Sequence, residues 1–185
     1  MKLIKIFASF VMILALFTLT ACSGNNSEAN AQAAETENTA TTVSTSEYSD
    51  AYNFSTQKLD GSALALDDYK GKVVIVDLWD TWCPPCRKEI PHFIELYTEY
   101  KDQGFVMIGL AFGQEGQKAV EEFVQEYGVN YINGYVNQDV IDKFGQPRGI
   151  PTTYVIDQNG TIHNKYVGYR DKSVFEADIQ ALLGI

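Results

Sequence analysis

Two cysteines separated by two prolines, Cys83 and Cys86, constrain this chain more than any other feature. They follow residues 73–79 (VVIVDLW), an apolar and largely β-branched run that is typical of a buried strand. Residues 84–101 place apolar side chains at helical spacing, so the first cysteine should lie at the N-terminus of a helix. Free N–H groups and the helix dipole favour a thiolate there. The second cysteine lies one turn further on, close enough to bond the first.

Strand and helix signals alternate through the rest of the chain. Strands are expected over residues 105–112, 152–156 and 161–167, and helices over 119–127, 138–144 and 173–183. The last helix would have Ser173 as its N-cap. Residues 54–59 and 63–66 predict an additional hairpin at the front. This order of elements predicts an α/β domain in which helices flank a central mixed sheet.

The N-terminal segment, residues 1–21, has the composition of a targeting signal. Two lysines precede an apolar run over residues 6–17, which is short of the about 20 residues that a membrane span needs. That run alone leaves an uncleaved anchor helix open as an alternative. Residues 19–22 (LTAC) resemble the bacterial lipobox. The resemblance implies a lipoprotein signal peptide, with Cys22 acylated and anchored in a lipid bilayer on the extracytoplasmic side of a bacterial envelope.

The next segment, residues 22–50, is predicted to be the lipidated N-terminus followed by a disordered acidic tether. It holds five acidic residues and no Lys or Arg, and its small polar side chains cannot offset the entropy of ordering. Its charge should keep the folded part away from anionic lipid, and we interpret it as a spacer without a partner. Residues 51–185, about 135 in number, have the size and apolar content of one domain.

Charge and cysteine content exclude several classes of protein. A net charge of −10 argues against nucleic-acid binding, which needs a basic face. With Cys22 acylated, Cys83 and Cys86 are the only thiols left. A zinc site would need two further ligands, and the only histidines, His92 and His163, are poorly spaced for it, so no metal is expected. A purely structural role is also disfavoured, because so small a loop constrains little of the unfolded chain.

Two motifs together resemble the thioredoxin superfamily. Residues 76–86 (VDLWDTWCPPC) resemble its active site, and Pro91 matches the proline that kinks its active-site helix. Residues 149–153 (GIPTT) resemble its cis-proline loop, which faces the disulfide. The resemblance covers about residues 52–185.

The chain is most similar to the membrane-tethered TlpA/ResA-like branch. Cys86 and Pro151 lie 65 positions apart, which is longer than in minimal thioredoxin. The extra length would hold the insertion helix of that branch, near residues 117–127. The resemblance therefore implies a thioredoxin fold with an N-terminal hairpin extension and a βα insertion.

The resemblance also implies chemical roles. Cys83 is the expected nucleophile and Cys86 the resolving thiol, with no cofactor beyond their disulfide. Asp77 matches the buried acid that helps move the proton of the resolving cysteine. Glu89 matches a glutamate beside the disulfide in ResA-like reductases, although a solvated helix charge is an equally good interpretation. The residues expected to contact the substrate are Trp82, Pro84, Pro85, Ile150 and Pro151.

Charges near the thiols bear on the direction of electron flow. Pro85 removes an N–H that could stabilise the Cys83 thiolate, and Asp80 stands where relatives usually have a small residue. Asp77, Glu89 and Asp80 all add negative charge nearby, which disfavours a thiolate. A less stabilised thiolate makes the couple more reducing, so we predict a reductase.

The partners follow from that prediction. The expected substrates are disulfides of exported proteins, such as apocytochrome c. The expected electron donor is a membrane protein of the CcdA/DsbD type. The enzyme itself is expected to be a monomer. An oxidase or isomerase on the same fold is the nearest alternative. A thiol peroxidase is another, although it does not need this cysteine pair. A redox-inert binding or copper-delivery protein is a further alternative, disfavoured because such relatives use a CxxxC spacing.

Overall fold

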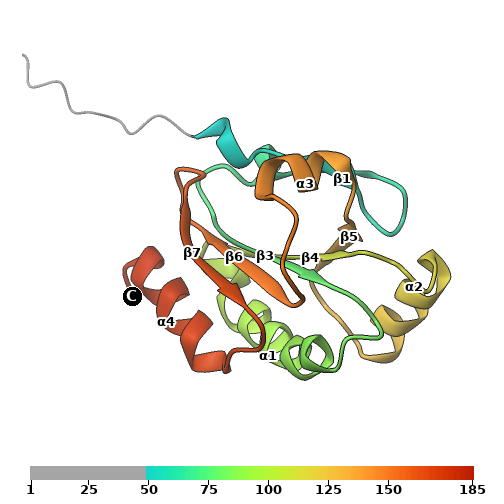
Figure 1. Cartoon of the computed structure of the whole chain (residues 1–185). Coiled ribbons are helices and arrows are strands. Elements are labelled where there is room, and N and C mark those ends of the chain that lie inside the picture. The colour runs from blue at the N-terminus through green and yellow to red at the C-terminus, as the bar shows by residue number, and fades with distance from the viewer. Residues whose placement is uncertain (1–48) are drawn as a thin grey trace, which may run out of the picture. The chain divides into compact units, whose positions relative to one another are not determined.

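The computed structural model describes residues 49–185, and their core is a five-stranded sheet of order β5-β4-β3-β6-β7 (Figure 1). β3, β4 and β5 run parallel, whereas β6 and β7 are antiparallel to their neighbours, so the predicted mixed sheet is confirmed. The predicted signal peptide, the acylated Cys22 and all but the end of the tether lie outside the described residues. The strands are β3 (Val73–Trp79), β4 (Phe105–Ala111), β5 (Ile132–Tyr135), β6 (Thr152–Ile156) and β7 (Ile162–Val167).

Helices cover both faces of the sheet, as Figure 1 shows. One face carries α1 (Pro84–Tyr100) and α4 (Lys172–Leu183). The other carries α3 (Gln138–Phe144) and the two-stranded sheet formed by β1 (Ser55–Gln57) and β2 (Ala63–Ala65). The insertion helix α2 (Gln117–Glu126) lies towards the β5 side of the sheet, and 3₁₀ turns occupy Asp50–Tyr52, Leu66–Tyr69 and Lys101–Gln103. No helix in residues 49–185 is long and apolar enough to cross a membrane.

The alternation of β3 places an acidic side chain under α1. Every residue of β3 is buried, and its side chains point to alternate faces of the sheet. The even-numbered ones pack with Phe144 of α3, whereas Val73 and Ile75 pack with Phe93 of α1. Asp77 follows in the odd-numbered series and therefore faces α1, the helix that begins at the cysteines.

The edge strand β5 was not expected from the sequence, because its centre is an Asn-Gly pair typical of turns. Gly134 is needed there for close packing, since a Cβ atom would lie 2.6 Å from the carbonyl oxygen of Gln57. Leu59 N–H also donates to the Asn133 carbonyl, so the N-terminal hairpin is bound to this strand. β5 is therefore held by its parallel pairing with β4 and by a hairpin about 75 residues earlier in the chain.

The predicted N-cap of the last helix is wrong. Helix α4 begins at Lys172, which places Ser173 inside its first turn, and Asp171 occupies the cap position. The Asp171 side chain accepts a hydrogen bond from the Tyr169 hydroxyl instead of capping the helix. The other predicted elements begin and end within two residues of the observed ones.

Candidate active site

The two cysteines form a disulfide at the N-terminus of α1. Cys83 is the N-cap residue and Cys86 lies in the first turn, with their Cα atoms 5.3 Å apart. Pro84 and Pro85 start the helix, where a missing N–H costs no intrahelical bond. Cys83 is 2% exposed and Cys86 is fully buried, so only the first sulfur borders solvent.

The Cys83 sulfur accepts a single backbone hydrogen bond from the helix. Cys86 N–H donates to Cys83 Sγ at 3.2 Å, whereas Arg87 N–H donates to the Cys83 carbonyl. Pro84 and Pro85 have no N–H, so two of the amides that normally point out of a helix N-terminus are absent. This end of α1 therefore stabilises a Cys83 thiolate less than an ordinary helix N-terminus does.

The loop before β6 faces the disulfide. The Ile150–Pro151 peptide bond is cis, and the Ile150 carbonyl oxygen lies 3.6 Å from Cys83 Sγ. Trp82, next to the cysteine, is 46% exposed. These groups surround the one sulfur that borders solvent, on the side from which a substrate can approach.

Two hydrogen bonds hold this loop in place. Thr152 Oγ1 donates to the Gly149 carbonyl at 2.6 Å, and Gly168 N–H donates to the Pro151 carbonyl at 2.8 Å. Gly168 belongs to the segment between β7 and α4, and the backbone of the same segment also donates a hydrogen bond to Glu89.

Two buried carboxyl groups occupy the space between β3 and α1. Asp77 is 2% exposed and accepts a hydrogen bond from Thr153 Oγ1 at 3.0 Å. Glu89 is fully buried, so the interpretation of a solvated helix charge is wrong. Glu89 Oε1 accepts a hydrogen bond from Arg170 N–H at 2.7 Å, while its Oε2 has no partner among the described residues.

Burial gives both carboxyl groups unusual proton affinities. Loss of solvation raises the pKa of Asp77 to about 7, against the lowering effect of the Thr153 hydrogen bond. Loss of solvation, followed by the negative charge of Asp77, raises the pKa of Glu89 to about 8. Near neutral pH these groups can therefore both hold and release protons, as a general acid or base must.

Asp80 has a structural role that the sequence did not indicate. Its carboxylate is fully buried and accepts hydrogen bonds from Thr81 N–H at 2.8 Å and Gln114 N–H at 3.1 Å. Its carbonyl accepts the N–H of Cys83. Asp80 thus ties the turn before the disulfide to the loop after β4.

Sequence reasoning missed Thr153 and Arg170. Thr153 pairs with Asp77 in the β3–β6 register, a relation that becomes visible only once the antiparallel pairing is known. Arg170 acts through its backbone N–H, for which no sequence signal exists. Within residues 49–185, no group of three or more His, Cys, Asp or Glu is arranged to hold a metal ion.

A sequence profile described as the AhpC/TSA family matches residues 48–165. The chain belongs to this family. It is similar to the thiol-disulfide oxidoreductase ResA of Bacillus subtilis (strain 168), with 35% identity over 132 residues, 71% of this chain and 73% of that protein. ResA of Bacillus thuringiensis (strain Al Hakam) is 34% identical over 134 residues, 72% of this chain and 76% of that one.

A solved structure supports the same family assignment. The thiol:disulfide interchange protein of the thioredoxin family from Chlorobium tepidum TLS is 33% identical, with a TM-score of 0.66 over 71% of this chain and 94% of that one. These comparisons confirm the predicted thioredoxin fold and the predicted TlpA/ResA-like family. This chain is a thiol-disulfide oxidoreductase, and it carries a Cys83–Cys86 disulfide at the N-terminus of α1.

Proposed function

We propose that this oxidoreductase reduces disulfides of exported proteins from a lipid anchor on the outer side of a bacterial membrane. The observation that carries the direction is the single N–H donated to Cys83 Sγ, because the next two residues are prolines. A poorly stabilised thiolate raises the free energy of the reduced form, which makes the couple more reducing. Apocytochrome c is a suitable substrate class, and the enzyme acts as a monomer.

The reaction transfers two electrons to the substrate. The Cys83 thiolate attacks one substrate sulfur, forming a mixed disulfide and releasing the other substrate sulfur as a thiolate. The Cys86 thiol loses its proton and attacks Cys83 Sγ, which releases the second substrate sulfur and forms the Cys83–Cys86 disulfide. Two electrons from a membrane donor of the CcdA/DsbD type then restore the dithiol.

The buried carboxyl groups suit the proton step of this cycle. Cys86 is fully buried, so its proton has no direct path to water. Glu89 lies one helical turn beyond it on α1, and Asp77 lies close enough for its charge to raise the pKa of Glu89. We assign the pair to accept the Cys86 proton during resolution.

The direction of electron flow is tested by equilibrating the protein with glutathione redox buffers. We expect a midpoint potential more negative than about −200 mV, in the range of thioredoxin-like reductases. The fraction of oxidised protein is measured by thiol alkylation and mass shift. A potential near about −120 mV, as in strong oxidants, contradicts the reductase assignment and favours the oxidase alternative.

The anchor is tested at Cys22, which lies outside the described residues. Its lipobox resemblance supports acylation, and two or more acyl chains hold a protein stably at a bilayer. We expect the wild-type protein in the membrane fraction and Cys22→Ser in the soluble extracytoplasmic fraction. Retention of Cys22→Ser on the membrane in the same proportion as wild type overturns the proposed lipid anchor.

A further inference from the structure

A cleft of about 250 Å³ opens beside the disulfide. Trp82, Phe112 and Ile150 supply its apolar lining, and Gln114 and Gln146 also line it. Trp82 and Ile150 also flank Cys83 Sγ, through the chain connection and the 3.6 Å approach of the Ile150 carbonyl. The cleft therefore lies next to the attacking cysteine.

The charge of the cleft is opposite to that of the protein. Residues 51–185 contain 19 acidic and 12 basic side chains, yet the residues that line the cleft include no Asp or Glu. Their one charged member is Arg148. The residues that line the cleft therefore carry a net positive charge, whereas the domain as a whole is acidic.

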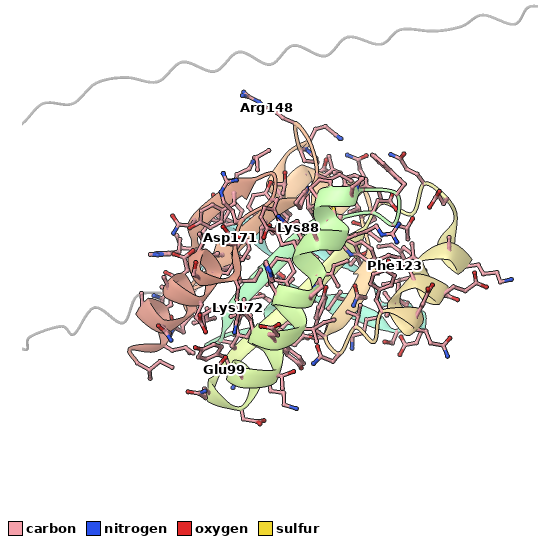
Figure 2. All side chains as sticks on the ribbon, turned by 90° about the horizontal axis from the view of Figure 1, so that it is seen from below. Lys88, Glu99, Phe123, Arg148, Asp171 and Lys172 are labelled. Atoms are coloured by element: carbon pink, nitrogen blue, oxygen red, sulfur yellow. A yellow bond between two sulfur atoms is a disulfide. The ribbon has the colours of Figure 1, made fainter. Side chains whose placement is uncertain are left out.

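The guanidinium of Arg148 is available for a ligand. Arg87 donates to the Tyr127 hydroxyl and lies over two aromatic rings, and Arg170 donates to the Gly168 and Tyr169 carbonyls. Arg148 makes no hydrogen bond or ion pair with any residue in the part of the chain that the structure describes. Figure 2 shows its side chain extending away from the body of the domain.

We infer that the cleft selects substrates whose attacked cysteine is flanked by an acidic residue and an apolar one. The apolar side chain packs against Trp82 and Ile150, and the carboxylate binds the planar fork of Arg148, which can donate two parallel hydrogen bonds. This inference rests on the proposed reductase function, for which it names the class of protein segment that is reduced.

The test must separate a local contact from the overall field, because the net negative charge repels any acidic peptide. Arg148→Glu and Lys101→Glu change the net charge equally. Lys101 is exposed and lies beyond the C-terminal end of α1, whereas the disulfide is at the N-terminal end. Comparing the two variants at one ionic strength therefore isolates the contribution of the cleft.

The substrates are three disulfide-linked peptides that differ only in one residue beside the cysteine: Asp, Asn or Lys. The full-length reduced protein is mixed with each, and the second-order rate of peptide reduction is measured. We expect Arg148→Glu to lower the Asp-to-Asn rate ratio about fivefold, as for the loss of one partly exposed ion pair. Arg148→Lys should retain part of the preference, and Lys101→Glu all of it.

The outcomes are distinct for the two proposals. Equal wild-type rates for the Asp and Asn peptides, or the same loss of preference in Lys101→Glu and Arg148→Glu, overturn the selection of acidic segments. Failure of the wild-type protein to reduce any of the three peptides contradicts the proposed reductase function and the inference with it.

Discussion

Replacing Cys83 with serine should abolish disulfide reduction, lowering the rate at least about 10³-fold, because a serine hydroxyl does not ionise to a nucleophile near neutral pH. Cys83 is the member of the pair that borders solvent and faces the Ile150 carbonyl, so the buried Cys86 cannot take over the first attack. Reduction of insulin disulfides, followed by turbidity, measures this loss.

Cys86→Ser should behave differently, since it keeps the attacking thiol and removes the resolving one. The first step then proceeds and the second cannot, so mixed disulfides with substrate accumulate up to one per protein molecule. Non-reducing electrophoresis of the native envelope, followed by mass spectrometry, identifies the trapped proteins and thereby the physiological substrates.

Cys22→Ser provides the matched control, because it makes the same substitution at the third cysteine. In detergent solution it should reduce insulin at the wild-type rate. Insulin reduction that is retained in Cys83→Ser would contradict the assignment of Cys83 as the nucleophile. Peroxide turnover that persists in Cys86→Ser, without insulin reduction in the wild type, favours the thiol peroxidase alternative instead.

The fold was predictable where local signals decide it. Residues 73–79 read as a buried strand and Pro84 as a helix start from their own side chains, and both agree with the structure. Features that depend on distant partners were missed or left open. Gly134 looks like a turn residue until the hairpin packs on it. The family resemblance places Glu89 beside the disulfide, but a surface charge stays an equal alternative until the hydrogen bond from Arg170, 81 positions away, is known.

The dependence on distant partners also limits what the sequence alone can show about Asp77 and Glu89. A carboxyl group in an apolar strand already suggests a special role, because burying an unpaired charge is costly. The sequence cannot show that a second carboxyl group faces it from α1, or that each has one hydrogen-bond donor. Those contacts, together with burial, determine the proton affinities of the pair.

The stability of the protein should fall as pH rises through the range in which this pair ionises. In the folded state the pKa of Asp77 is about 7 and that of Glu89 about 8, against ordinary values of 3.8 and 4.5. Between the ordinary pKa of each group and its raised pKa in the folded state, the folded state binds more protons than the unfolded state. The free energy of unfolding therefore decreases with increasing pH over this range. From pH 5 upward the extra protons are held over about two pH units by Asp77 and about three by Glu89. At about 1.4 kcal/mol per unit, we expect a loss on the order of 5 to 7 kcal/mol between pH 5 and pH 9.

Asp77→Asn combined with Glu89→Gln should remove most of that loss. Both amides can accept the hydrogen bonds from Thr153 and Arg170 without carrying a charge. The double variant should therefore match wild type at pH 5 and exceed it at pH 9, as measured by urea unfolding. Glu126→Gln, at an exposed site on α2, serves as the control and should follow the wild-type curve.

The same double variant should slow resolution of the mixed disulfide. In wild type, the rate of substrate release should rise with pH as the pair becomes able to accept the Cys86 proton, which happens near pH 7 to 8. Without the carboxyl groups we expect a rate at least about tenfold lower at pH 8, with no rise in that window. Stopped-flow measurement of thiol release gives both values. The double variant could instead show the wild-type pH profile of release and still show the altered stability curve. That outcome would restrict the pair to a structural role, because the proposed link between the two carboxyl groups and the release step is proton transfer.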